Sequence, residues 1–194
     1  MNRDGNRAVR CDRSGHDSGV SSSVVVRSTT PADHPAVLEL VRTAFSDDTR
    51  TGDEEVDIVV NTWSLGNAVR PIDLVAVDGY TIAGHVLGAR GTVGDDKVIG
   101  VAPLAVAPSH QGRGVGTMLM HGFLERADEA NWPLAVLLGS PAYYCRFGFE
   151  PASRFGITYA PVGAGNPHFQ ARRLRAFTNS SSGTFSYCWE QTSP

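Results

Sequence analysis

Three glycines and an arginine stand together in the run Gln111–Gly116 (QGRGVG), between an apolar stretch and an amphipathic one. The N-terminus of a helix carries about four unpaired backbone N–H groups and a partial positive charge, so phosphate groups bind there. Glycine lets the backbone adopt a positive φ and approach a ligand closely. Arg113 adds planar donors for phosphate oxygens. The run predicts a cradle for a pyrophosphate, with a simple glycine-rich connection as the alternative.

Two other phosphate-binding motifs are excluded. No Gly-Lys-Ser/Thr follows the run, so it is not a Walker A loop. Glycines at 112, 114 and 116 do not have the GxGxxG spacing, and no acidic residue stands where a dinucleotide-binding fold would hold ribose.

The strand before the run contains Pro103, which a central strand would normally exclude. Proline removes one donor from the ladder and marks a bulge or a splay, although it also occurs where a strand only protects an edge. A splayed strand would expose the backbone of Leu104, Ala105 and Val106, and an extended ligand with amides could pair there as an extra strand. A pyrophosphate beside two amides describes coenzyme A.

Two motifs then resemble the GNAT superfamily of N-acetyltransferases. Gln111, Gly114 and Gly116 fit its Gln/Arg-x-x-Gly-x-Gly/Ala signature, and Leu138–Phe149 (LGSPAYYCRFGF) resembles a later segment in which a tyrosine precedes a Gly-Phe pair. Together with APLAV and FQARRLRAF, the second motif is similar to a bacterial subgroup of predicted N-acetyltransferases. The resemblance covers about residues 23–190.

The resemblance implies roles for particular residues. Backbone amides of the run would hold the pyrophosphate, the strand would hold pantetheine, and an N–H near Val106 would polarise the thioester carbonyl. Tyr144 would lie near the sulfur and protonate the departing thiolate as a general acid, the alternative being a packing aromatic. The residues expected to bind acetyl-CoA are Leu104, Ala105, Val106, Gln111, Gly112, Arg113, Gly114, Val115, Gly116 and Tyr144.

The sequence departs from the family pattern in two places. Ser140 lies in the segment where many relatives have asparagine, and it could instead cap the following helix. The strand Ile99–Val106 lacks the carboxylate that many relatives use as general base. The base could be a water molecule, His85 or a residue near an acidic loop.

Several further residues have a chemical and a structural interpretation. An acidic cluster could attract a cationic amine or could be a solvated loop, and Trp63 and Tyr80 could line the acceptor pocket. Cys145 could form an acyl intermediate, although direct attack by the amine is simpler. The cluster consists of Asp47, Asp48, Asp53, Glu54, Glu55 and Asp57.

Two functions from different classes follow. One is an acetyl-CoA-dependent N-acetyltransferase that modifies a primary amine of a small molecule or protein by direct attack. The other is a non-catalytic acyl-CoA-binding sensor or a module of a complex. Tyr144 favours the enzyme, because a sensor needs the cradle but no acid. Relatives often form homodimers, so a homodimer is a further expectation.

The elements that must position these residues follow from hydrophobic periodicity. They alternate in a mixed α/β order, and the resemblance adds a mostly antiparallel sheet splayed around an acyl-CoA cleft and flanked by helices. Thr30 and Asp33 predict a capping box and Asp78-Gly79 predicts a hairpin turn. Strands are expected at 23–28, within 71–93, at 95–108, 133–139, 155–160, 169–175 and 184–190, with helices at 31–45, up to Trp63, at 113–130 and up to Gly148.

Length and composition limit the number of domains and the classes of function that the chain can have. The chain has 194 residues, which suits one domain at 23–190 after a polar extension at 1–22 that we expect to be disordered. A net charge of −3 gives no reason to expect nucleic-acid binding. No apolar run is long enough to span a membrane. Three cysteines without CxxC spacing argue against a zinc site and a disulfide framework and suggest a cytoplasmic protein.

Overall fold

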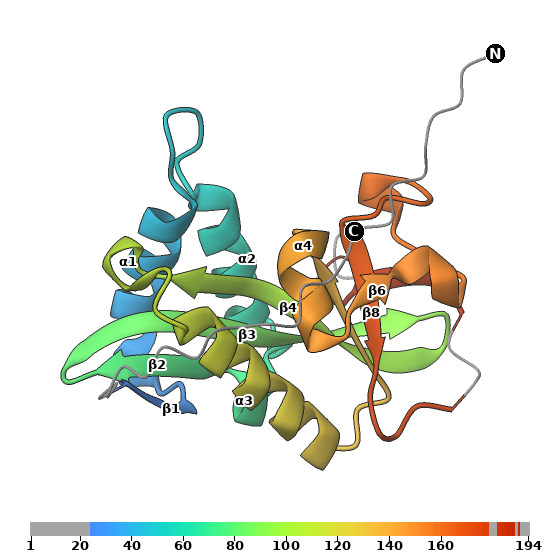
Figure 1. Cartoon of the computed structure of the whole chain (residues 1–194), viewed down its shortest axis with the longest axis horizontal. Helices are drawn as coiled ribbons and strands as arrows, with labels where there is room; N and C mark the ends of the chain where they lie inside the picture. The colour runs from blue at the N-terminus through green and yellow to red at the C-terminus, as the bar shows by residue number, and fades with distance from the viewer. Residues whose placement is uncertain (1–23, 179–181, 189, 191–194) are drawn as a thin grey trace.

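The computed structural model describes residues 24–178, 182–188 and 190, and the predicted N-terminal extension lies outside them. Within these residues one sheet of nine strands runs in the order β1-β2-β3-β4-β5-β8-β6, and β9 pairs with both β3 and β7. Most neighbouring strands are antiparallel, whereas β4–β5 and β7–β9 are parallel. The mixed, mostly antiparallel α/β class that the sequence predicts is therefore confirmed (Figure 1).

The bounds of the elements agree with the sequence predictions most closely in the first three quarters of the chain. The strands are β1 (Val24–Ser28), β2 (Leu74–Asp78), β3 (Thr81–Val93), β4 (Asp96–Val106), β5 (Leu134–Leu138), β6 (Glu150–Pro151), β7 (Ile157–Thr158), β8 (Phe169–Arg173) and β9 (Gly183–Tyr187). The helices are α1 (His34–Phe45), α2 (Asp53–Ser64), α3 (Val115–Glu129) and α4 (Pro141–Tyr144).

The first helix begins later than predicted. Residues Pro31–Asp33 form a 3-10 turn, and α1 starts at His34. The predicted capping pair is present, because the Asp33 carboxylate accepts hydrogen bonds from the Thr30 N–H at 2.8 Å and from its hydroxyl at 2.7 Å. Arg27 of β1 donates two more bonds to the same carboxylate, at 2.7 and 2.8 Å, which fastens the start of α1 to the sheet.

The hairpin between β2 and β3 turns one residue later than predicted. Asp78 pairs with Thr81, so the two turn residues are Gly79 and Tyr80 rather than Asp78 and Gly79. Gly79 has φ +60°, a backbone conformation that favours glycine at the first turn position.

Helices cover both faces of the sheet (Figure 1). Residues Val37, Val41 and Val59 of α1 and α2 pack with Val75 and Leu87 on one face. On the other face α3 buries an apolar stripe against the strands, consisting of Val115, Leu119, Met120, Phe123, Leu124 and Ala127. The alternation along each strand therefore separates two cores.

A fork opens in the sheet between β4 and β5. These parallel strands are joined by two residue pairs, Ile99–Ala135 and Gly100–Val136, and the pairing stops there although both strands continue. On the opposite edge of β4 the register with β3 shifts between Val86 and Gly88, where β4 carries the extra residue next to Pro103. The predicted bulge and splay at the proline are both present.

The last quarter of the chain differs from the sequence predictions. The strand predicted at 155–160 is reduced to β7, and β6 was not predicted. The strand predicted at 184–190 is β9, which returns to pair with β3 through Gly91–Tyr187 and Val93–Phe185. Pairing between segments so distant in the chain leaves no local signal in the sequence.

Candidate active site

The loop between β4 and α3 presents a row of unpaired amides. The first helical hydrogen bond of α3 runs from Met118 N–H to Gly114 O at 3.0 Å. In the part of the chain that the structure describes, no backbone carbonyl accepts from the N–H groups of residues 112–117. These six consecutive donors lie in an exposed loop and at the positive end of a helix of fifteen residues, a combination that attracts an anion.

Glycine stands at positions 112, 114 and 116 of this loop for two different structural reasons. Gly112 and Gly114 have φ +71° and +81°, and a Cβ on either would meet nothing within 4 Å. Neither glycine is therefore crowded on the side where a side chain would stand. Gly116 is instead covered, because a Cβ there would lie 2.6 Å from the hydroxyl of Tyr143.

The fork exposes the backbone of alternate β4 residues. Ala107 N–H donates to Ala83 O of β3 at 2.9 Å, so the hydrogen-bonding alternation of an antiparallel pair turns Ala105 towards β3 as well. The N–H and C=O groups of Leu104 and Val106 then point away from β3, into the fork. The sequence groups Leu104, Ala105 and Val106 together, whereas the register leaves only the first and third of them facing a ligand.

The Gln111 side chain ties the loop to the strand. Its amide nitrogen donates to Val106 O at 3.2 Å. This bond occupies the last outward carbonyl of β4 and leaves the neighbouring N–H groups free to face the fork. Arg113 is exposed at the centre of the loop, where its guanidinium can reach an anion held by the amides.

Tyr144 reaches the fork from α4, beside the end of β5. A Cβ on Gly139 would overlap the Tyr144 ring, so the ring lies directly against the backbone of Gly139. Tyr143 packs edge-on against it, with ring centroids 4.9 Å apart. Burial, and to a smaller extent the neighbouring phenol of Tyr143, raises the pKa of Tyr144, which keeps its hydroxyl protonated.

Tyr143, the neighbour of Tyr144, packs against the core and also contacts α3. Its hydroxyl lies at the first turn of α3, near Gly116, and hydrogen bonds to the Thr117 side chain. Arg146 lies over its ring, with the guanidinium carbon 4.9 Å from the centroid. Tyr143 thus joins α4 to the helix end that carries the unpaired amides.

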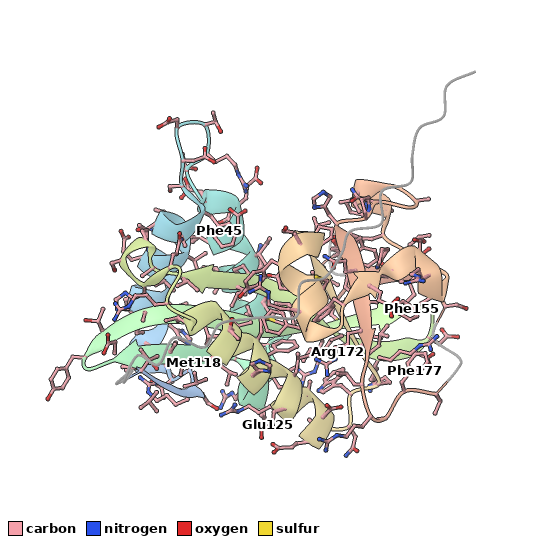
Figure 2. The ribbon with its side chains drawn as sticks, viewed as in Figure 1. Phe45, Met118, Glu125, Phe155, Arg172 and Phe177 are labelled. Atoms are coloured by element: carbon pink, nitrogen blue, oxygen red, sulfur yellow. The ribbon has the colours of Figure 1, made fainter. Side chains whose placement is uncertain are left out.

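Strand β8 fixes the segment that carries both tyrosines. Arg172 donates to Phe147 O at 2.7 Å, and Gln170, which is buried, donates to Gly139 O at 3.0 Å. Figure 2 shows Arg172 beside the α4 segment, on the side of the molecule opposite Phe45 of α1. Ser140 is exposed at the start of α4. It contributes its backbone carbonyl to Tyr143 N–H and Tyr144 N–H, but its side chain makes no capping bond.

His85 is held in a buried acid–base pair on the α1–α2 face. Its Nε2 lies 2.8 Å from Asp73 Oδ1, and Trp63 Nε1–H donates to Asp73 Oδ2 at 2.8 Å. Burial alone would raise the pKa of Asp73, but the hydrogen bonds from His85 and Trp63 outweigh it, so that pKa is lowered. Nδ1 of His85 has no hydrogen-bond partner among the described residues. His85 is therefore only half satisfied and stays a candidate for the general base.

The acidic residues are mostly engaged locally. Asp47 accepts bonds from the Thr49 and Arg50 amides, Asp53 pairs with Arg42 at 3.0 Å, and Glu55 pairs with Arg50. These contacts support the interpretation of a structured, solvated loop. Cys145 is partly exposed and follows Tyr144 directly, with its thiol 3.7 Å from Ala142 O.

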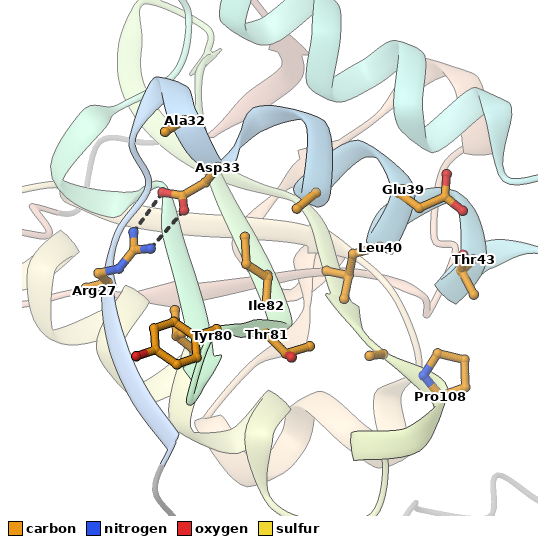
Figure 3. Close-up of a pocket in the computed structure, with 13 residues that line it drawn as sticks. Arg27, Ala32, Asp33, Glu39, Leu40, Thr43, Tyr80, Thr81, Ile82 and Pro108 are labelled. Atoms are coloured by element: carbon orange, nitrogen blue, oxygen red, sulfur yellow. Dashed lines mark hydrogen bonds and ion pairs between the residues drawn. The ribbon is translucent and has the colours of Figure 1, made fainter.

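Tyr80 lies away from the fork. It is fully exposed at the β2–β3 turn and borders a shallow hollow of about 560 Å³ between that hairpin and α1 (Figure 3). The Arg27–Asp33 pair and Leu40 also line this hollow. Trp63 stacks on His34 with ring centroids 3.8 Å apart. Neither aromatic residue lines the fork.

The described residues form neither a membrane-spanning helix nor a metal-binding cluster. Among them, no helix is long and apolar enough to cross a membrane. In the same part of the chain, no group of three or more His, Cys, Asp or Glu side chains could hold a metal ion.

A family model described as an acetyltransferase (GNAT) domain matches residues 25–152. The chain belongs to this family, and the resemblance found in its sequence is confirmed. The family's enzymes transfer an acetyl group from acetyl-CoA to an amine, and this is the class of enzyme that the fold and the family define.

Individual relatives agree with this assignment. The uncharacterized N-acetyltransferase YhbS of Escherichia coli strain K12 is 30% identical over 154 residues, which are 78% of this chain and 87% of that protein. The crystal structure of E. coli YhbS in complex with CoA has a TM-score of 0.76 at 29% identity and covers 89% of this chain and 93% of that one. A GNAT family acetyltransferase from Brucella melitensis in complex with acetyl-CoA has a TM-score of 0.69 at 23% identity over 84% and 95% of the two chains, which adds the likeness of fold.

Proposed function

We propose that this chain binds acetyl-CoA in the β4–β5 fork and transfers its acetyl group to a primary amine by direct attack. The observation that carries the proposal is the row of six unpaired amides at the start of α3, directly after the strand that borders the fork. An anion site and an open strand edge adjoin each other, as a pyrophosphate followed by an amide-bearing arm requires.

The residues present fit the cofactor. The uncrowded side of Gly112 and Gly114 leaves room for a pyrophosphate. The outward N–H groups of Leu104 and Val106 and the carbonyl of Leu104 match the acceptors and donors of pantetheine. Leu138, the last residue of β5, is 51% exposed at the opposite arm of the fork. An arm lying between the two strands would cover this apolar side chain.

Acetyl-CoA supplies a thioester whose leaving group is a thiolate. The N–H of Leu104, the outward donor nearer the closed end of the fork, polarises the carbonyl, and the amine attacks its carbon as the C–S bond breaks. Tyr144 faces the developing charge on sulfur. A thiol has a pKa near ~8.5, well below that of this buried phenol, so Tyr144 stabilises the thiolate chiefly by donating a hydrogen bond. The proton that the amine loses goes to His85 through water, or to solvent.

The sharpest test of the cradle is calorimetric titration of CoA and acetyl-CoA into wild type and a Gly114→Glu variant. The carboxylate would stand where the pyrophosphate binds, and like charges repel. The matched control is Gly66→Glu. Gly66 has φ +68° at the end of α2, and a Cβ there also meets nothing within 4 Å. Both substitutions therefore impose a similar backbone strain.

We expect micromolar binding by wild type and by Gly66→Glu, and at least a 100-fold loss in Gly114→Glu, or about 2.7 kcal/mol. Equal binding by all three proteins would show that the loop does not bind the pyrophosphate. No binding by wild type would show that the fork is not a cofactor site. Release of free thiol in the presence of a panel of primary amines then separates the enzyme from a sensor, which would bind without turnover.

The acetyl acceptor is proposed only as a class, a primary amine on a small molecule or a protein. A homodimer and a cytoplasmic location likewise stay predictions, the first from the family resemblance and the second from the cysteine pattern.

A further inference from the structure

The closed end of the fork carries a tyrosine that no motif in the sequence indicates. Gly100–Val136 is the last pair between β4 and β5, so Val101 is the first β4 residue inside the fork. Its partner on β3 is Gly88, whose carbonyl accepts from Val69 N–H at 2.8 Å on the other edge of β3. Val101 is thus in a non-hydrogen-bonded pair, and its carbonyl points into the fork.

The hydroxyl of Tyr187 lies 3.5 Å from that carbonyl oxygen. Tyr187 belongs to β9 and pairs with Gly91 of β3, so its side chain must cross β3 to reach β4. The absence of a side chain at Gly100 makes this crossing feasible, because a Cβ there would overlap the Tyr187 ring. The ring is buried, with 8% of the residue exposed, and it packs with Ala102 and Val136 on that face.

The orientation of the cofactor follows from the order of the elements and rests on the proposed function. The pyrophosphate lies at the start of α3, which follows the end of β4. The pantetheine arm then runs back along β4, past Val106 and Leu104, and its acyl end arrives near Val101. That end meets Tyr187, with Tyr144 on the opposite side.

We propose that Tyr187 forms the end wall of the acyl pocket and restricts the enzyme to short acyl groups such as acetyl. Burial, followed by the charges that Tyr159, Glu190 and Tyr144 would bear, raises the pKa of Tyr187, so the wall is a neutral phenol at any physiological pH. The ring lies over Gly100 and packs with Ala102 and Val136, so it would block additional methylenes at the closed end of the fork.

The test is the affinity for free CoA, acetyl-CoA, butyryl-CoA and hexanoyl-CoA, measured by calorimetry without an acceptor. Wild type is compared with Tyr187→Val, which removes the ring. The matched control is Tyr159→Val. Tyr187 forms one aromatic cluster with Tyr159, Phe169 and Phe185, in which the centroid of the Tyr159 ring lies 6.1 Å from that of Tyr187. Its substitution loosens the cluster without opening the wall.

We expect wild type and Tyr159→Val to bind hexanoyl-CoA at least ~10-fold more weakly than acetyl-CoA. In Tyr187→Val this ratio should fall by about tenfold while the affinity for free CoA changes less than about twofold. An unchanged ratio in Tyr187→Val would contradict the proposal. If that variant does not fold, equal binding of acetyl-CoA and hexanoyl-CoA by wild type overturns it. Failure of the proposed function can be told apart from failure of the end wall, because in the first case wild type would not bind free CoA at all.

Discussion

At the scale of single residues, the site depends on side chains that are neutral and closely packed. Tyr144 lies against Gly139 and Tyr143, and its phenol remains protonated because burial raises its pKa. Among the described residues, His85 uses one ring nitrogen, Nε2, to bond Asp73, and its Nδ1 has no hydrogen-bond partner. The proposed mechanism thus combines a neutral donor, Tyr144, with a candidate base, His85, on the other face of the sheet.

Tyr144→Phe should lower kcat by about 100-fold, a typical contribution of a positioned proton donor, and should leave the affinity for CoA within about threefold. The phenylalanine preserves the packing against Gly139 and removes the hydroxyl alone. Thiol release with an active amine measures kcat, and calorimetry measures the affinity. Undiminished turnover would assign the donor role to another group.

The pH dependence of kcat/KM gives a separate prediction. The rate should rise with pH as the acceptor amine loses its proton, and it should not fall again below about pH 10, because the raised pKa of Tyr144 keeps the donor protonated. A descending limb between pH 8 and 9.5 in wild type, absent from Tyr144→Phe, would show that this phenol ionises normally.

At the scale of the elements, two glycines position the tyrosine pair. Gly139 follows β5 directly and lies under the ring of Tyr144, and Gly116 lies in the first turn of α3, close to the hydroxyl of Tyr143. The two motifs of the sequence thus meet in one contact between α3 and α4.

Gly139→Ala should reproduce the loss of Tyr144, because the added methyl group overlaps the ring and displaces it from the fork. We expect kcat to fall by at least tenfold, together with a loss of stability of about 1–3 kcal/mol from overpacking. Ser140→Ala is the neighbouring control, since that side chain is exposed and makes no capping bond. Thiol release and urea unfolding measure the two effects, and normal turnover in Gly139→Ala would separate Tyr144 from the fork.

Local patterns predicted the elements and motifs that depend on neighbouring residues. The capping box of α1, the bulge at Pro103 and the glycine loop all have their determinants within a few residues. The sequence did not indicate Tyr187 or Gly100 as partners, and it did not pair His85 with Asp73. Such contacts depend on which strands become neighbours, and period-two patterns specify a buried face without naming the partner strand.

At the scale of the whole molecule, two buried tyrosines make stability sensitive to alkaline pH. Burial raises the pKa of Tyr144 and Tyr187 in the folded protein, whereas both ionise near pH ~10 when the chain is unfolded. Their contribution is therefore complete below pH 10 and is lost as pH rises above it, by about 1.4 kcal/mol per pH unit for each phenol that stays neutral.

Urea unfolding of wild type and Tyr187→Phe at pH 8, 9.5 and 11 measures this contribution. The difference in the free energy of unfolding between the two proteins should be constant from pH 8 to 9.5 and should shift in favour of the phenylalanine variant at pH 11. A constant difference throughout would mean that Tyr187 ionises in the folded protein as readily as in the unfolded chain.

The return of β9 to β3 has a consequence for how the protein is made. The ribosome releases both arms of the fork, β4 and β5, well before it releases the strand that carries Tyr187. Pairing between such distant segments is a slow step in folding. We therefore expect the proposed end wall to form after the loop that leads into α3, so that selectivity for short acyl groups is the last property of the site to be completed.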